Sequence, residues 1–254
     1  MAPAESTEIH TRILRMTLGE PECLAYWQHV DLAVPADERA AVAFEQRWFG
    51  ARTMARCRTI IATLAQRFDD TPEAIAALRA WQGMPVDARV LVCHWHLQRT
   101  DSIYRAFTGR FLVERRVAGK ATVDRDQVER WVQATWGDRW AAATRIKFAG
   151  NLLTAAGEAG LVAGRTNPRK LVTPRVSDDA LVYLLYLLRG ATFEGTLFEN
   201  PYLASVGLDA TVLPARLASL HGLTVRRLGD VVDVEWSWPD LRAWAEHAGE
   251  APPS

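Results

Sequence analysis

The sequence predicts a mainly α-helical protein, in which a helical N-terminal domain is followed by a winged helix-turn-helix C-terminal region with two short β-hairpins. Three observations predict this class. Apolar residues recur at three- and four-residue spacing from residue 8 to about residue 117, almost without period-two alternation. A helix, a Gly137-Asp138 turn, a longer helix and two short apolar segments then follow in the order of a winged helix-turn-helix. Near the C-terminus, a turn separates two segments that alternate as strands do.

Turn-forming residues divide the N-terminal region into successive helices. One helix places Met54, Ile60, Leu64 and Phe68 on a common face and stops at the Asp-Asp-Thr-Pro cluster of residues 69–72. Two further helices, at about 86–98 and 101–117, complete a domain expected to span residues 1–120. The small and polar segment 117–122 is the expected boundary.

Residues 121–254 are expected to form the winged-helix-like domain, which can be divided into two winged units, 121–176 and 203–250. In the first unit, Thr122 or Asp124 caps a helix that runs to Trp136, and a long helix extends from about residue 139 to 158. Segments 161–163 and 171–173 flank a basic loop and form the first hairpin. The second unit comprises a helix at 211–220, strands at 223–227 and 231–236 around Gly229-Asp230, and a closing helix at 241–248.

Composition restricts the class of protein. The chain has 254 residues, with 30 Lys and Arg against 30 Asp and Glu, so bulk charge does not draw it to polyanions. Three widely spaced Cys favour a reducing compartment over a disulfide framework. The sequence shows no apolar segment of membrane-spanning length and no secretory signal, and we therefore expect a cytoplasmic protein.

The neutral total hides an uneven distribution of charge. Residues 138–175 carry a net charge of +5, whereas residues 176–254 carry −6. The positive block coincides with the long helix and the first hairpin, where a winged helix-turn-helix would contact DNA.

The long helix has two distinct faces at 100° per residue. Ile146, Ala149, Gly150 and Leu153 lie on an apolar face that we expect to be buried, and Phe148 and Leu152 lie on a flank that is expected to pack partly on the first domain. The opposite face, a stripe of Thr144, Lys147, Asn151, Thr154 and Glu158, is expected to meet the DNA groove. Lys147, and Arg145 from off the stripe, suit phosphates or guanine, and Asn151 suits adenine. The predicted DNA-binding residues, which we expect to be exposed, are Arg139, Thr144, Arg145, Lys147, Asn151, Arg165, Arg169 and Lys170. A solvated basic face without a ligand is the alternative interpretation.

The sequence carries two other groups of charged residues. The basic residues Arg110, Arg115, Arg116 and Lys120 are the second candidate for contact with DNA. In contrast, the second hairpin would repel phosphates and is more suited to supporting the fold or meeting a protein, because it carries Asp230, Asp233 and Glu235.

No enzyme signature is recognisable, and we expect a protein that is not an enzyme and uses no cofactor or metal. Residues 119–122 (GKAT) lack the upstream glycine and strand of a phosphate-binding loop. Residues 93–96 (CHWH) place only Cys93 and His96 on one helix face, which favours buried packing over metal binding. Residues 200–202 (NPY) lack the second proline of the base-methylating tetrad, and no glycine-rich cofactor loop accompanies them.

Several segments resemble the BrxA family, a small component of the BREX bacteriophage-exclusion systems. They are residues 90–111 (VLVCHWHLQRTDSIYRAFTGRF), the helices that hold Trp131, Trp140 and Thr144, residues 152–161 (LLTAAGEAGL) and residues 183–185 (YLL). The resemblance implies a helical protein with winged-helix character that is associated with double-stranded DNA and has no known catalytic residues.

The sequence thus predicts a non-catalytic double-stranded DNA-binding component of a phage-defence system, with other components of that system as further partners and no contact with a membrane. The competing hypothesis is a protein-interaction scaffold, in which the winged folds are docking modules and the acidic C-terminal surface holds a larger enzyme. An enzyme with an unrecognised site is a third class.

Overall fold

The computed structural model describes residues 3–228 and 231–248, and it is mainly helical, as the sequence predicts. The helices are η1 (Arg12–Leu14), α1 (Glu20–His29), α2 (Ala36–Glu45), α3 (Met54–Phe68), α4 (Pro72–Ala80), α5 (Val86–Thr100), α6 (Ser102–Ala106), η2 (Phe107–Phe111), α7 (Leu112–Val117), α8 (Arg125–Trp136), η3 (Gly137–Arg139), α9 (Ala142–Glu158), α10 (Asp178–Arg189), α11 (Pro201–Ser205), α12 (Leu213–Leu217) and α13 (Leu241–Ala245). The strands are β1 (Thr122–Val123), β2 (Val162–Ala163), β3 (Arg169–Leu171), β4 (Leu223–Leu228) and β5 (Val231–Trp236). Among the described helices, none has both the length and the apolar character needed to cross a bilayer.

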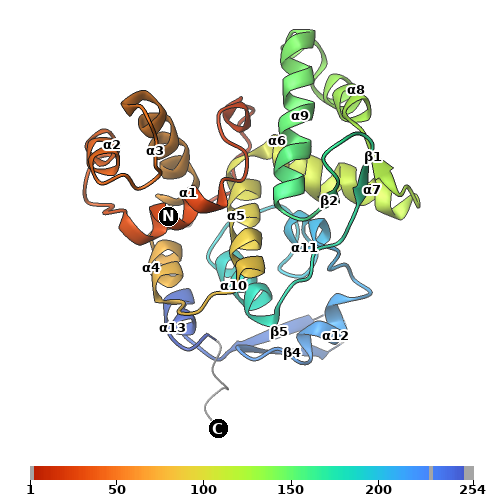
Figure 1. Cartoon of the computed structure of the whole chain (residues 1–254). Coiled ribbons are helices and arrows are strands. Elements are labelled where there is room, and N and C mark those ends of the chain that lie inside the picture. Colours follow the sequence, from red (N-terminus) through yellow and green to blue (C-terminus); the bar gives the residue numbers. More distant parts are fainter. Residues whose placement is uncertain (1–2, 229–230, 249–254) are drawn as a thin grey trace.

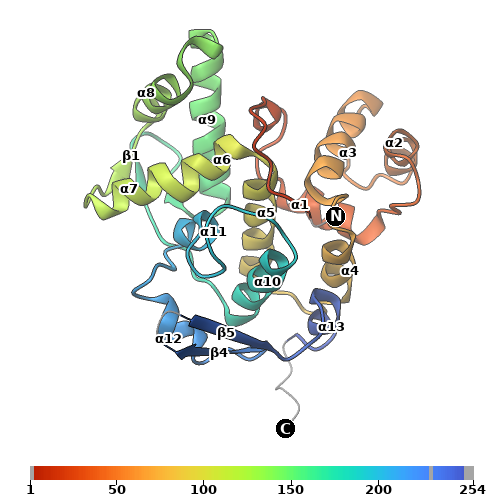
Figure 2. The same cartoon turned by 180° about the vertical axis from the view of Figure 1, so that it is seen from behind.

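The N-terminal region from residue 8 to 117 contains helices and connecting turns but no strand, which confirms the prediction for this part of the chain. Figure 1 shows α2 and α3 rising on one side of the molecule and α8 and α9 on the other, with the N-terminal segment between them. Figure 2 shows the same arrangement from behind, with β4 and β5 at the opposite end from α8 and α9.

The helical stretch from α6 to α7 contains one π-helical turn, η2, at the place where α11 packs on it. Gly109 allows this contact. A Cβ atom at position 109 would lie 2.5 Å from Pro201 Cβ and 2.9 Å from the Pro201 carbonyl oxygen, which is closer than van der Waals contact permits. Glycine is therefore required here for close packing.

The first sheet has three antiparallel strands in the order β1-β3-β2. The strand β1, which has only two residues and contains Thr122, was not predicted from the sequence. Asp124, one of the two expected caps, is the N-cap of α8, and its side chain and that of Gln127 form a capping box. The second strand of the hairpin was predicted at residues 171–173. The strand lies instead at Arg169–Leu171, because β3 pairs with both β1 and β2 in this register.

The second sheet is the antiparallel pair β4 and β5, in register from Leu223 opposite Trp236 to Leu228 opposite Val231. Both predicted strands are confirmed, whereas the expected turn residues Gly229 and Asp230 lie outside the described residues. The neighbouring helices are shorter than predicted: α12 covers Leu213–Leu217 and α13 covers Leu241–Ala245. Asp240 caps α13 by accepting a hydrogen bond from the Ala243 N–H at 2.8 Å.

One hydrophobic core runs through residues on both sides of residue 120. His94 of α5, for example, hydrogen-bonds Ser205 Oγ of α11 at 2.9 Å, and Trp81 packs edge-on against Trp244 of α13. The division of the chain into domains 1–120 and 121–254 stays a prediction.

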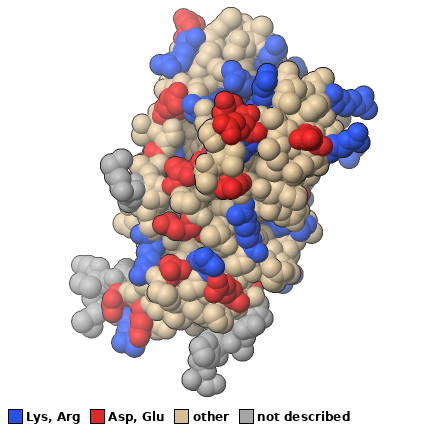
Figure 3. All heavy atoms as spheres, turned by 90° about the vertical axis from the view of Figure 1, so that its left-hand side faces the viewer, with Lys and Arg blue, Asp and Glu red and all other residues tan. Residues whose placement is uncertain are grey.

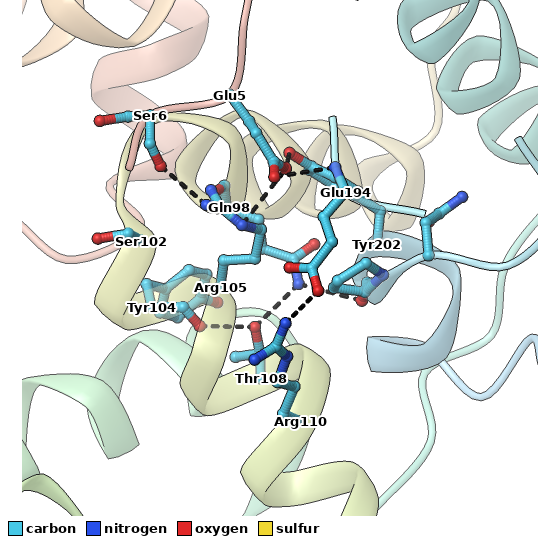
Figure 4. A network of polar contacts seen from close by, with 12 residues as sticks. Glu5, Ser6, Gln98, Ser102, Tyr104, Arg105, Thr108, Arg110, Glu194 and Tyr202 are labelled. Atoms are coloured by element: carbon cyan, nitrogen blue, oxygen red, sulfur yellow. Dashed lines mark hydrogen bonds and ion pairs between the residues drawn. The ribbon is translucent and has the colours of Figure 1, made fainter. Parts of the chain in front are cut away.

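A polar network around Glu5 fastens the N-terminal segment to this core (Figure 4). The Glu5 carboxylate accepts hydrogen bonds from the Tyr202 hydroxyl at 2.7 Å and the Glu194 N–H at 3.0 Å, and it lies 3.4 Å from Arg105 Nε. Arg105 in turn donates to the Ser6 carbonyl at 2.8 Å. One carboxylate therefore connects three parts of the chain that are far apart in sequence.

Candidate nucleic-acid interface

Helices α8 and α9 form the framework of the candidate interface. Gly137, with a φ of 60°, ends α8 and starts the turn η3, so the long helix begins at Ala142 rather than near residue 139 as predicted. A series of aromatic rings leads from α8 to α9: Trp131 meets Trp136 edge-on within α8, the Trp136 and Trp140 centroids lie 6.3 Å apart across the turn, and Trp140 packs on Phe148 of α9 with 4.6 Å between ring centroids. This packing fixes how α9 is presented.

The buried face of α9 agrees with the predicted one only in part, since Ala149 and Leu153 are buried as expected. Phe148 and Leu152, expected on a partly packed flank, are 0 % exposed, whereas Ile146, expected inside, is 46 % exposed. The prediction for Ile146 was wrong because α9 packs against both α8 and η1, and the two contacts together rotate the buried face toward Phe148.

Only part of the predicted DNA-facing stripe is open to solvent. Lys147 and Thr154 are exposed and Thr144 is half-buried. Asn151 donates from Nδ2 to the Ile13 carbonyl at 2.9 Å, so its amide is engaged with the N-terminal segment instead of being free for adenine. Glu158, at the end of the same stripe, accepts the Leu18 N–H at 2.8 Å. Residues 13–18 thus contact the C-terminal half of α9 through Asn151 and Glu158.

The expectation that Arg145 is exposed was wrong. Its side chain is 15 % exposed and pairs with Glu129 of α8, Nε to Oε1, at 2.9 Å. Arg145 Nη1 also donates to the Trp140 carbonyl at 2.8 Å. Arg145 therefore holds α9 against α8 and against the turn that precedes it.

The first hairpin presents most of its predicted cations. Arg165 is exposed in the connection between β2 and β3, and Lys170 is exposed in β3, where it stands opposite Thr122 and Ala163. Arg169 was expected at the loop surface, but it is a partly buried residue of β3, and its Nη1 donates to the Leu153 carbonyl at 2.7 Å. This bond attaches the hairpin to α9.

The exposed cations of the candidate interface are Arg139 in η3, Lys147 in α9, and Arg165 and Lys170 in the hairpin. None of them forms an ion pair with any residue that the structure describes. These four cations come from η3, α9 and the β2–β3 hairpin, and we define the four residues as the basic surface.

Figure 3 presents the left-hand side of the view in Figure 1, and on that face basic and acidic residues are interspersed.

Tertiary packing brings two further arginines near α9 that sequence reasoning missed. Arg15 and Arg56 are exposed and, together with Asn151 and Glu158, line a hollow of about 480 Å³ between the N-terminal segment, α3 and α9. Arg56 Nη1 donates to the Arg15 carbonyl at 3.1 Å. No local sequence pattern signals this proximity, since both arginines are separated from the start of α9 by 86 positions or more.

The second candidate patch is largely engaged in holding the fold together. Arg110 pairs with Glu194, and Arg115 donates to the Thr122 carbonyl (Figure 4 shows Arg110 and Glu194). Arg116 donates to the carbonyls of Ser205 at 2.9 Å and Val172 at 3.1 Å. Of the four residues, Lys120 alone has an exposed side chain with no hydrogen bond or ion pair to the described residues.

Residues 93–96 are buried, as the sequence predicts. The His94 ring contacts the Tyr104 hydroxyl at 2.8 Å and Ser205 Oγ at 2.9 Å, and His96 Nε2 lies 2.7 Å from the Tyr183 hydroxyl. Burial and the nearby Arg116 charge lower the pKa of His94 to about 3, and burial lowers the pKa of His96 well below its usual value. In residues 3–228 and 231–248, no cluster of three or more His, Cys, Asp or Glu side chains could hold a metal ion.

In the second hairpin, Asp233 and Glu235 are exposed, and Glu235 pairs with Arg226 at 3.1 Å. Val234 and Trp236 on the other face of β5 are half-buried, and Asp230 lies outside the described residues.

A scan against protein-family models found no match for this chain, and no curated protein matches it.

Proposed function

We propose that this protein is a non-catalytic double-stranded DNA-binding protein that uses α9 and the β2–β3 hairpin. The observation that supports this most strongly is the order of elements β1, α8, α9, β2, β3 together with the sheet order β1-β3-β2. A winged helix-turn-helix has this arrangement, with its second helix in the major groove and its hairpin beside it.

The positions of the free cations agree with such a role. Lys147 lies in the first half of α9, which the N-terminal segment leaves open, and Arg165 and Lys170 lie on the adjoining hairpin. Cations that have no carboxylate partner are available to phosphates, because no ion pair must be broken first. A phage-defence role rests on the resemblance of residues 90–111 and 152–161 to the BrxA family and is part of the proposal.

A fluorescence-anisotropy titration of the full chain with short duplexes of unrelated sequence, at two salt concentrations, tests the proposal. We expect binding to every duplex at low salt and weaker binding at high salt, because phosphate contacts release counterions. An absence of binding at low salt would contradict a DNA-binding function.

A protein-docking role is the second candidate. A hollow of about 400 Å³ is lined mainly by apolar residues, among them Phe198, Leu213, Leu217 and Val225, and also by the exposed Glu199. Val225 pairs with Val234 of β5, which lies between the exposed Asp233 and Glu235 in the chain. An apolar depression beside acidic residues suits a basic protein partner. Replacement of Asp233 and Glu235 by Lys should weaken co-purification with other defence components and leave DNA affinity unchanged or improved.

A further inference from the structure

Two exposed arginines that are far apart in sequence line the hollow of about 480 Å³ beside α9. Arg15 lies in the N-terminal segment, and Arg56 lies in the first turn of α3. Arg56 Nη1 donates to the Arg15 carbonyl at 3.1 Å, so the two residues are held next to each other. The Arg15 side chain has no hydrogen bond to any residue that the structure describes, and neither arginine forms an ion pair with one. Both cations are therefore available to an anion.

A series of contacts joins this pair to the exposed face of α9. Asn151, which also lines the hollow, donates to the carbonyl of Ile13 at 2.9 Å, two positions before Arg15. The exposed Lys147 lies one turn before Asn151 on the same side of α9. Figure 1 shows the N-terminal segment between α3 and α9. A row of cations, Lys147, Arg15 and Arg56, thus leads from α9 over the N-terminal segment to α3.

The chain around Arg56 carries cations and no carboxylate. Residues 46–58 contain no Asp or Glu, and they contain four exposed arginines, Arg47, Arg52, Arg56 and Arg58. None of the four forms an ion pair with a described residue. The start of α3 is therefore a positively charged region, and Arg56 is its member that lines the hollow.

Three carboxylates line the same hollow. Glu158 accepts two hydrogen bonds from the N-terminal segment, and Glu20 pairs with Arg89 Nε at 2.9 Å. The buried Arg67 adds a further positive charge, because it donates to two backbone carbonyls of residues 17–18, which line the hollow. Glu22 is half-buried and has no hydrogen bond or ion pair to a described residue. Glu22 is therefore the carboxylate that most opposes an anion here.

We propose that Arg15 and Arg56 form a second phosphate-contact site, which binds the backbone of the same DNA duplex that α9 and the β2–β3 hairpin contact. This inference rests on the proposed function. The arginine pair positions the duplex and reads no sequence, since phosphate contacts fix register and orientation rather than base identity. Guanidinium groups suit this role because each presents several N–H donors to phosphate oxygens.

Anisotropy titrations of the full chain with a short duplex at several salt concentrations test the site. Arg15→Ala removes a side chain without a hydrogen bond to the described residues, and it should make the slope of log K against log salt shallower by about 0.9. Arg15→Ala combined with Arg56→Ala should make the slope shallower by about 1.8. Between about 50 and 200 mM salt, this double variant should therefore lose about twelvefold less affinity than the parent.

Arg58→Ala is the matched control for the charge. Arg58 is also an exposed arginine of α3 without an ion pair to a described residue, but it does not line the hollow. Its replacement should leave the slope unchanged.

Two further variants separate a phosphate contact from a structural role. Arg15→Lys combined with Arg56→Lys keeps both charges and should retain the parent's slope, because counterion release depends on charge. Glu22→Gln removes the opposing charge and should tighten duplex binding by about twofold to fivefold.

The outcomes distinguish this site from the proposed function. A parent chain that binds no duplex at low salt overturns both. If the parent binds, the site alone is overturned by a folded Arg15→Ala variant with the parent's affinity and slope, by a lysine variant with the slope of the alanine variant, or by a Glu22→Gln variant that binds no more tightly. If circular dichroism shows that the double alanine variant does not fold, Arg15→Ala alone decides.

Discussion

Glu158 of α9 accepts the backbone N–H of Leu18 at 2.8 Å, and this contact joins two segments separated by 140 positions. Its other oxygen accepts the Thr17 hydroxyl at 2.9 Å. Through Glu158 and Asn151, the N-terminal segment is attached along the helix that we propose to contact DNA. The orientation of α9 therefore depends on residues 13–18 as well as on α8.

Replacement of Glu158 by Ala should lower the free energy of unfolding by about 1–2 kcal/mol, because two hydrogen bonds to a carboxylate are lost at a partly exposed site. Chemical denaturation monitored by circular dichroism measures this change. Thr154→Ala is the control: Thr154 is exposed one turn earlier on α9, and its hydroxyl bonds only the Gly150 carbonyl of the same helix. Equal stabilities of the two variants would show that the Glu158 contact contributes nothing.

The helices and strands could largely be predicted from the sequence because their signals are local. The capping residue Asp124 and the alternation of residues 231–236 are read within one turn of helix or a few residues of strand. The two-residue strand β1 was missed, since a segment so short carries no periodicity and is defined by its pairing with β3.

A matched pair of glycines tests the packing around the π-helical turn. Gly109→Ala should destabilise the fold by about 1–3 kcal/mol, because the new Cβ would overlap Pro201 and force η2 and α11 apart. Gly150→Ala should instead stabilise it by about 0.5–1 kcal/mol, since a Cβ in the middle of α9 meets no atom within 4 Å and alanine favours the helix. Thermal or chemical denaturation of both variants measures the difference, and a Gly109 variant as stable as the parent would contradict the close contact with Pro201.

Stability should fall as the pH is lowered below about 6.5. The folded-state pKa of His94 is about 3, below its ordinary value of 6.5, so between these pH values the unfolded chain binds a proton that the folded chain does not. The stabilisation is complete above the ordinary pKa and is lost as the pH falls toward the folded pKa, by up to about 1.4 kcal/mol per pH unit for one histidine. His96, whose pKa is also lowered, contributes in the same direction.

Urea denaturation at several pH values between 4 and 7.5 measures this dependence. His94→Gln should reduce the slope of stability against pH by about one proton, whatever its effect on stability at neutral pH. An unchanged slope would mean that His94 is not held neutral by the fold.

The candidate site was less predictable than the fold because exposure depends on partners distant in sequence. Helical periodicity assigned Asn151 to an open surface, and Arg145 was expected to be exposed beside it, but the Ile13 carbonyl engages Asn151 and Glu129 engages Arg145. Arg15 and Arg56 could not be connected with α9 at all without the tertiary structure. In contrast, Lys147, Arg165 and Lys170 are exposed as predicted: Lys147 lies on a face of α9 that no other element covers, Arg165 lies in the connection between β2 and β3, and Lys170 lies on the solvent side of β3.

The proposed DNA surface can be tested by neutralising the three exposed cations that α9 and the hairpin carry. For a protein held by phosphate contacts, log K falls with log salt by about 0.9 for each phosphate neutralised, so the triple variant Lys147→Ala, Arg165→Ala and Lys170→Ala should show a slope shallower by up to about 2.7. Because none of these side chains forms an ion pair with a described residue, the variant should melt within a few degrees of the parent.

Arg58→Ala is a charge control, since Arg58 is also exposed but lies on α3, two positions from Arg56 and hence on a different side of that helix. It should leave the slope unchanged. Anisotropy titrations at several salt concentrations give both slopes. A folded triple variant with the parent's affinity and slope would show that α9 and the hairpin are not the DNA surface, and the exposed arginines Arg15 and Arg56 would then be the next residues to replace.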